Sequence, residues 1–597
     1  MNLNIIKFDG QTRQLCFVYF LFLSIFGASY GFWNAPFSYA MDNSLGLNFI
    51  RNFEQHSSYL AWLKSSKSLV HVIGSYGFFL GFNHDTLSTL FSTITSTIYV
   101  FGLGTIALLL IRDIKIASLT TIFLSIEPPF RLLETTYGLE AIASPHLSSL
   151  GAGLAFLTIG LYIAKRGILC NFVSFLNLSI HPILAIFPIM LISIDLLRNY
   201  IFKKKWPRVN ISLSTILPIF FPIFCWAYYF IFVGKPDLFE VNQADFNHYI
   251  DVWDYHRNIE IKLTTIWIFV ILAIALLLFR AFFTPQNLDR RLHSITLSFL
   301  AAAILVLALL PLLNLPILTE LAEKLITGRF TAIFEPLMII YAVALSRKIL
   351  KKVIFQFKLN INFDLCFLGM CLFLTSLFLK FDLFTPYFQK KLASTSFHLT
   401  FSLTLLFILC LYFLIKENTY KKRKFCFSLK KWSTISFTLF MFSILSGTFI
   451  FENLIQQMHR QLTSYCPVSS SNTVALSSDS VGVIFFQRYC TKPVLLDVSS
   501  FDYIPYVPSA STSLRDEIEI IYGIDFKDEN APDSLSSGRF RDLWQDRSTK
   551  EWIEIAAKYN FSVISTPSHW NLKLEKVSGT NDLNIYSLNE TTERLKK

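Results

Sequence analysis

Residues 87–111 read LSTLFSTITSTIYVFGLGTIALLLI, 25 consecutive positions without a charged side chain. A helix needs about 20 apolar residues to cross the roughly 30 Å of hydrocarbon in a bilayer, so this stretch is long enough to span one. Similar runs recur along the chain, and we expect about thirteen spans. They are residues 15–33, 87–111, 116–126, 147–164, 167–180, 183–197, 209–233, 261–283, 293–313, 330–346, 361–380, 395–416 and 433–453.

The composition of the 597 residues agrees with a polytopic membrane protein. Hydrophobic residues make up 53% of the chain and charged residues 16%, whereas soluble domains carry about 25% charged residues. This composition excludes a single water-soluble core, a disordered chain, a secreted domain and a single-span receptor. The first apolar run lacks a small-x-small cleavage site after it, so we expect an uncleaved anchor rather than a signal peptide.

The net charge of +12 is unevenly distributed. From residue 454 to the end there are 15 basic and 18 acidic residues, so this part carries −3 and the preceding part carries +15. The basic residues of the preceding part fall mostly in short loops, such as those at Lys203 and Lys421. The positive-inside rule places these loops and the N-terminus in the cytoplasm, with residues 454–597 on the other side. No basic stripe with interleaved aromatics occurs, so no nucleic-acid partner is expected.

Two domains are predicted. Residues 1–453 form an all-α transmembrane bundle, with a first outer loop at 34–86 and a second at 127–146. In the first outer loop, residues 69–82 are apolar enough for an interfacial helix. Spans 167–180 and 183–197 are short and are expected to form a hairpin that bends at Pro182.

Residues 454–597 are predicted to be a small α/β domain outside the cytoplasm, because strand-like and helical runs alternate. The expected strands are 481–486, 493–498, 561–565 and 583–588, and the expected helices are 514–522 and 549–559. The segment has no phosphate-binding glycine loop and no GxSxG motif, which favours an accessory role. Cys466 and Cys490 would face an oxidising compartment, so they form either a disulfide or a pair of free thiols.

Carboxylates in the two outer loops are the first candidates for chemistry. They can hold a divalent cation such as Mg²⁺ or Mn²⁺ on a phosphate ester, or one of them can deprotonate an acceptor hydroxyl. The alternative is that they are ordinary solvated charges. The residues concerned are Asp42, Asp85, Glu127, Glu134 and Glu140, with Arg131 beside the last three.

Two further ionisable residues lie at or near membrane depth. His181 precedes the Pro182 bend and is either a functional group or a cap on the broken helix. Arg329 begins a later span, where a guanidinium can grip a lipid phosphate with two hydrogen bonds or can extend to the headgroup region. In the loop at 235–262, acidic and aromatic residues suit sugar binding, but we favour an ordinary interfacial loop.

Four stretches resemble bacterial polytopic membrane proteins of the GT-C glycosyltransferase type, in a branch with an HP hairpin and an outer C-terminal domain. They are ASPHLSSLGAGLAFLTIGLYIAKRG (143–167), LSIHPILAIFP (178–188), ITGRFTAIFEPLMIIYA (326–342) and FFQRYCTKPVLLDVSSFDYIPY (485–506). One position departs from that branch, because His146 stands where Arg is usual. The WWD-type motif of oligosaccharyltransferase catalytic subunits is missing, so transfer to a peptide asparagine is not expected.

The resemblance implies an enzyme in a bacterial plasma membrane that takes a sugar from a polyprenyl-phosphate carrier and transfers it to a glycan, lipid or protein at the outer face. We assign catalysis to Asp42 and Glu134, phosphate binding to Arg329 and Arg131, and supporting roles to His181, Asp85 and Glu127. Asp42, Glu134 and Arg329 are expected to line one cavity open to lipid. The alternative is a non-catalytic transporter, flippase or scaffold of cell-surface polysaccharide assembly.

Overall fold

The structure is a computed structural model. It describes residues 10–35, 40–55, 57–65, 67–126, 146–203, 217–233, 241–253, 474–496 and 507–588, with single positions at 466, at 504 and between 333 and 347. Within these residues the protein is mostly helical, with one small four-stranded sheet near the C-terminus. We call residues 35–83 the first loop and residues 474–588 the C-terminal region.

Every predicted span that falls on described residues is helical. The helices of this part are α1 (Gly10–Asn34), α2 (Asp42–Asn48), α3 (Ser58–Ser65), α4 (Leu69–Phe79), α5 (His84–Ile111), α6 (Ile114–Ile126), α7 (Leu147–Ile163), α8 (Gly167–Ile180), α9 (Pro182–Lys203), α11 (Phe220–Tyr228) and α12 (Gln243–His248). Two of them, α1 and α5, are long and apolar enough to cross a membrane, and several shorter helices are similarly apolar. The predicted spans from 261 to 453 lie outside the described residues, apart from isolated helical positions between 333 and 347.

Helices α1 and α5 pack closely because α1 has glycine at the contact. A Cβ atom on Gly27 would lie 2.8 Å from the Ser96 carbonyl oxygen, and one on Gly31 would lie 2.3 Å from that of Ser92. Both values are shorter than any van der Waals contact, so only glycine lets the two backbones approach this far. Spacing of glycines four residues apart is typical of closely packed membrane helices.

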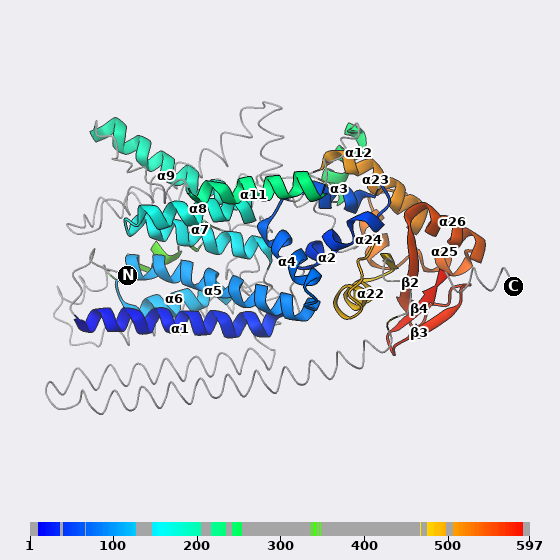
Figure 1. Cartoon of the computed structure of the whole chain (residues 1–597), viewed down its shortest axis with the longest axis horizontal. Helices are drawn as coiled ribbons and strands as arrows, with labels where there is room; N and C mark the ends of the chain where they lie inside the picture. The colour runs from blue at the N-terminus through cyan, green and yellow to red at the C-terminus, as the bar shows by residue number, and fades with distance from the viewer. Residues whose placement is uncertain are drawn as a thin grey trace.

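Helices α5 and α7 run in the same direction. Gly102 of α5 packs on the Gly153 backbone, and Gly160 of α7 packs on Thr105. Arg112 and Lys165, which follow the last turns of the two helices, therefore lie at the same end of the bundle. Arg347 also lies at this end, because its Nη2 is 2.6 Å from Asp113 Oδ2. The C-terminal region lies at the opposite end (Figure 1).

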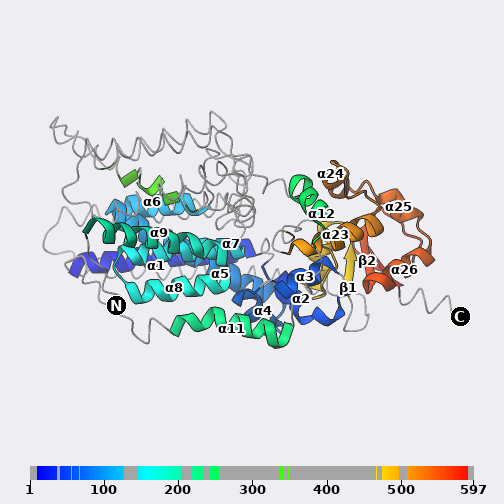
Figure 2. The same cartoon turned by 90° about the horizontal axis from the view of Figure 1, so that it is seen from above.

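The predicted hairpin at Pro182 is present. Helix α8 ends at Ile180 and α9 begins at Pro182. Helix α9 then runs alongside α7, since the Tyr162 hydroxyl donates to Asp195 Oδ2 over 2.8 Å at one end and His181 packs on Gly151 at the other. Figure 2 shows α7, α8 and α9 side by side.

The C-terminal region contains a mixed sheet in the order β1-β2-β4-β3. Strand β1 (Val474–Ser477) pairs parallel with β2 (Phe561–Pro567), whereas β4 (Leu583–Ser587) pairs antiparallel with β2 and β3 (Lys576–Gly579). Helices surround the sheet. They are α22 (Ser480–Ile484), α23 (Ser511–Glu517), α24 (Ala531–Ser536), α25 (Arg541–Asp546) and α26 (Thr549–Tyr559), with π-helical turns η7 (Phe485–Tyr489) and η10 (Ile518–Tyr522).

The predicted strand at 481–486 is wrong. These residues form α22 and the start of η7, because the Asp479 side chain accepts a hydrogen bond from Gly482 N and so caps a helix. Most of the apolar run is buried, although Val481 is 50% exposed, and burial of this kind does not distinguish a short helix from a strand. In the described part of the predicted strand 493–498, residues 493–496, the strand pairing is an isolated bridge between Val494 and Ala475. The other predicted strands and helices of this region agree with β2, β4, α23 with η10, and α26.

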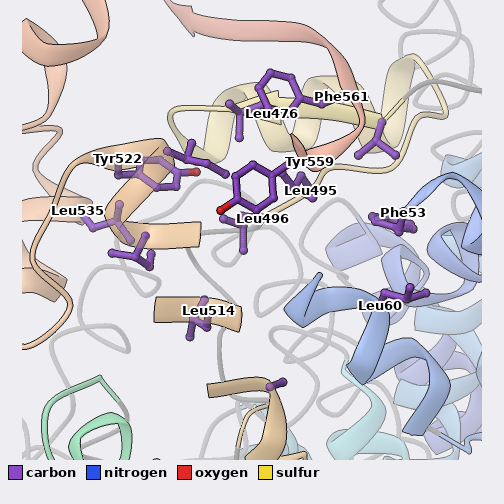
Figure 3. Packing of buried hydrophobic residues seen from close by; sticks show 14 of the residues in the cluster. Phe53, Leu60, Leu476, Leu495, Leu496, Leu514, Tyr522, Leu535, Tyr559 and Phe561 are labelled. Atoms are coloured by element: carbon purple, nitrogen blue, oxygen red, sulfur yellow. The ribbon is translucent and has the colours of Figure 1, made fainter. Parts of the chain in front are cut away.

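The hydrophobic core of the C-terminal region extends into the first loop. Phe53, Leu60 and Val72 of the first loop belong to the same buried cluster as Leu476 and Tyr522. Figure 3 shows Phe53 and Leu60 with the C-terminal members of this cluster. Residues of η4 (Tyr229–Val233), α12 and η5 (Tyr249–Trp253) also join it. The C-terminal region is therefore packed onto the helical part rather than tethered beside it.

Candidate functional site

A carboxylate and an imidazole meet where the first loop returns to helix α5. Asp42 is the first residue of α2 and His84 is the first residue of α5. Their side chains are in contact, with His84 Nε2 2.7 Å from Asp42 Oδ1. The His84 side chain is 3% exposed and that of Asp42 is 12% exposed, so the carboxylate is the member of the pair that solvent or a ligand reaches.

The local sequence explains why His84 faces inward. Asn83 is the N-cap of α5, and its side chain accepts a hydrogen bond from Thr86 N. The helix therefore starts with His84, whose ring lies beside the Phe78 ring, 6.1 Å between centroids. One turn later, Ser88 Oγ lies 3.1 Å from His84 Nδ1.

These contacts define the proton positions on the imidazole. An ionised carboxylate only accepts hydrogen bonds, so the Nε2 atom of His84 is the donor to Asp42. With a neutral ring, Nδ1 is then the acceptor and the Ser88 hydroxyl donates to it. The buried chain Ser88–His84–Asp42 holds the carboxylate in one orientation at the end of the bundle.

The next residue, Asp85, connects the same turn of α5 to the C-terminal region. Arg488 Nε lies 2.9 Å from Asp85 Oδ1, and the two side chains are 11% and 19% exposed. Arg488 Nη2 also donates to the Ala35 carbonyl at the end of α1 over 3.1 Å. Because His84 and Asp85 are consecutive, a carboxylate, an imidazole and a guanidinium gather around one helix start.

The segment that carries Arg488 is fixed by a disulfide. Cys490, two residues further on, is bridged to Cys466 with a Cα–Cα distance of 5.5 Å, so of the two alternatives expected from the sequence the disulfide is the one formed in the structure. Tyr489 lies between Arg488 and Cys490 in the sequence, and burial raises the pKa of its phenol. The bridge and the packing of Phe485 and Phe486 in a buried cluster hold η7 in place.

Removing the bridge is expected to destabilise the C-terminal region. Cys466→Ser should lower its free energy of unfolding by about 3 kcal/mol, because a closed loop of this size constrains the unfolded chain. Urea unfolding of the wild type and the variant, followed by tryptophan fluorescence, measures the difference. Alkylation of both cysteines in the native, unreduced protein, detected by mass spectrometry, would contradict the bridge itself.

His181 has a structural role at the break between α8 and α9. Its Nδ1 accepts a hydrogen bond from Leu184 N over 3.4 Å, and its backbone N donates to Asn177 O over 2.7 Å. The side chain is 8% exposed and packs on Gly151. These contacts agree with a helix cap, which was one of the two interpretations of this residue. His146 is likewise an N-cap residue, that of α7.

Glu127, Arg131, Glu134 and Arg329 lie outside the described residues, so the shared cavity with Asp42 stays a prediction. Of the loop at 235–262, residues 241–253 are described, and they contact the C-terminal region. Asp245 is buried against Arg515 at 2.8 Å, and Trp253 stacks on Phe526.

A divalent cation does not fit the described part of the site. Asp42 is already bound to His84 and Asp85 to Arg488, and no group of three metal-ligating side chains occurs among the described residues.

Sequence reasoning missed His84 and Arg488 as partners of the predicted acids. The signal for His84 was its place beside Asp85 at the start of an apolar run, after a capping asparagine. Arg488 lies in the quoted stretch FFQRYC, but its partner is about 400 residues away in sequence. No protein-family model matches the chain, and no curated protein is detectably similar to it.

Proposed function

We propose that the protein is a membrane glycosyltransferase of the GT-C type that uses a sugar carried on a polyprenyl phosphate. The observation that carries the proposal is the pair of Asp42 and His84 at the start of α5, with the Asp85–Arg488 ion pair on the next residue. His84 begins α5 and Arg112 follows its last residue, so this end of the bundle is opposite to the basic turns at Arg112 and Lys165. A lipid carrier cannot leave the bilayer, so the chemistry has to lie at a bilayer surface.

In this proposal Asp42 is the general base. It takes the proton of the acceptor hydroxyl while the acceptor oxygen forms a bond to the anomeric carbon of the sugar. The bond between that carbon and the phosphate oxygen breaks, and polyprenyl phosphate leaves with the bonding electrons. His84 orients Asp42, and cationic side chains stabilise the departing phosphate. Arg488 is the described candidate, and Arg329 and Arg131 are the further ones.

The proposed membrane position has support from exposed apolar side chains. Phe79 and Leu80 at the end of α4 and Phe220 and Trp226 of α11 are at least 61% exposed. Lys67 lies 3.9 Å above the Trp226 ring, an arrangement of charge and aromatic that is common at the membrane–water interface. We propose about thirteen spans in a bacterial plasma membrane, with the N-terminus cytoplasmic and the C-terminal region outside.

This topology is tested with reporter fusions. A reporter fused after Lys205 or Lys424 should be found on the cytoplasmic side of the membrane, because basic loops stay inside. A reporter fused after Ser470 should be found on the outer side. If the reporter after Lys205 is found outside, or the reporter after Ser470 is found in the cytoplasm, the proposed orientation is wrong and the site assignment fails with it.

The activity is tested by transfer in proteoliposomes. Purified protein is given a polyprenyl-phosphate donor with a radiolabelled sugar and a panel of glycan, lipid and peptide acceptors. We expect label to appear in an acceptor and free polyprenyl phosphate to accumulate. No transfer to any acceptor of the panel would contradict the proposal.

The second candidate is a non-catalytic flippase or scaffold for lipid-linked sugars. One observation favours it, namely that both described acidic residues of the predicted site already have partners in the protein. A scaffold would bind the lipid-linked sugar without consuming it, and the same assay distinguishes the two candidates.

A further inference from the structure

A fully buried carboxyl group lies between the C-terminal region and the first loop. Glu517, the last residue of α23, is 0% exposed. Its Oε1 accepts from Ser58 N over 2.9 Å, and its Oε2 lies 2.5 Å from Ser58 Oγ, where the carboxyl group donates when protonated and accepts when ionised. The two residues are 459 positions apart, so the contact exists only when the C-terminal region is packed on the first loop.

Glu517 also completes helix α3. Ser58 is the first residue of α3, and the N–H groups of a first helical turn have no partner within their own helix. The carboxyl group supplies that partner from another part of the chain. The same side chain therefore caps the N-terminus of α3 and joins the C-terminal region to the first loop.

The surroundings of Glu517 disfavour a negative charge. Within the described residues no lysine or arginine forms an ion pair with Glu517. The nearest arginine in sequence, Arg515, instead pairs with Asp245 and Asp516. The titratable groups that face Glu517 are Glu54 of the first loop and Tyr559 of α26. Burial raises the pKa of Glu517 to about 8, although the hydrogen bonds from Ser58 oppose this shift.

We propose that Glu517 is a proton-controlled latch, which holds the C-terminal region on the first loop when protonated and releases it when ionised. The latch is coupled to the candidate site, because the docked C-terminal region also delivers Arg488 to Asp85. Glu517 is thus a positioning residue that acts through Arg488. Its effect on catalysis rests on the proposed function, but the docking itself does not.

The direction of the pH effect follows from linkage. The carboxyl group has its usual pKa of 4.5 when released and about 8 when docked. The docked state therefore holds an extra proton between these values, and docking weakens as the pH rises from 4.5 through 8. From pH 6 to pH 8 the equilibrium constant for release should rise roughly 50-fold and change little above pH 9.

The test measures distance rather than activity. Fluorophores are attached through unnatural amino acids at Gln55 and Lys558, two exposed positions on opposite sides of the contact. Energy transfer is then recorded in the full-length protein from pH 5 to 9, in mild urea so that both states are populated. The wild type should lose energy transfer as the pH rises, whereas Glu517→Gln, which carries no ionisable group, should keep it at every pH.

Glu519→Gln is the matched control, because its side chain is exposed two residues along the same segment and should leave the wild-type curve unchanged. Ser58→Ala gives a second test. Ser58→Ala removes a hydrogen bond to the ionised carboxylate and should raise the pKa of the docked Glu517 further. Release should then level off at a higher pH than in the wild type. A wild-type curve that is flat from pH 6 to 8, or one that Glu517→Gln does not alter, would overturn the latch. Asp42→Asn should leave the curve intact, so failure of the latch and failure of the proposed activity are distinguishable.

Discussion

Asp42→Asn should lower the rate of sugar transfer by about 10²–10⁴-fold while the protein stays folded. The amide keeps the size of the side chain and can still accept a hydrogen bond from His84, but it cannot take a proton from the acceptor hydroxyl. The loss should appear in kcat and leave the KM for the lipid-linked donor nearly unchanged, because Asp42 acts on the acceptor. Initial rates in proteoliposomes measure both constants.

The matched control for Asp42 is Asp542→Asn, an exposed aspartate in α25. It removes one negative charge outside the candidate site and should leave the rate within about twofold, since exposed substitutions away from special features have small effects. Equal rates for wild type and Asp42→Asn would remove Asp42 from the chemistry, and the scaffold function would then be the better account.

Arg488→Ala should reduce transfer by about 10²–10³-fold, the usual effect of removing one group that stabilises developing charge. The change also leaves Asp85 without its ion-pair partner and removes the hydrogen bond to Ala35 at the end of α1. Arg488→Lys should restore part of the activity, because an ammonium keeps the charge but lacks the planar fork of donors.

A charge reversal separates the two roles of Arg488. If the ion pair only holds the C-terminal region, the double variant Asp85→Arg with Arg488→Asp should recover most of the activity. If the guanidinium at 488 also acts on the phosphate, the double variant should recover stability but not turnover, which is the result that we expect. The control is Arg539→Ala, an exposed arginine in the same region. Wild-type turnover in Arg488→Ala would show that the ion pair is irrelevant to function.

Local patterns in the sequence were enough to predict most helices. The run 549–559 has apolar residues at helical spacing after Ser548, whose hydroxyl and Glu551 form a capping box, and α26 has these bounds. His181 and Pro182 marked the α8–α9 break, since proline cannot continue the preceding helix. Short buried segments gave no such signal, so β1 was missed and 481–486 was assigned to the wrong element.

Residues of the candidate site were predicted singly but not with their partners. Asp42 and Asp85 were selected because carboxylates in an outer loop can hold a divalent cation on a phosphate ester or take a proton from an acceptor hydroxyl. Their partners come from packing: Gly74 lets α4 lie against α2, and the C-terminal core brings η7 to α5. Contacts such as Glu517 with Ser58 join residues hundreds of positions apart, and no periodicity or spacing in one sequence encodes them.

The central claim is that the protein consumes a polyprenyl-phosphate sugar at Asp42, and native mass spectrometry in lipid nanodiscs tests it most directly. Wild type and Asp42→Asn are loaded with the same donor, and the mass of the bound lipid is measured before and after the acceptor is added. We predict equal donor occupancy at the start, conversion to polyprenyl phosphate in the wild type, and intact donor in Asp42→Asn. Donor that stays intact in both proteins, or is consumed equally by both, would contradict the claim.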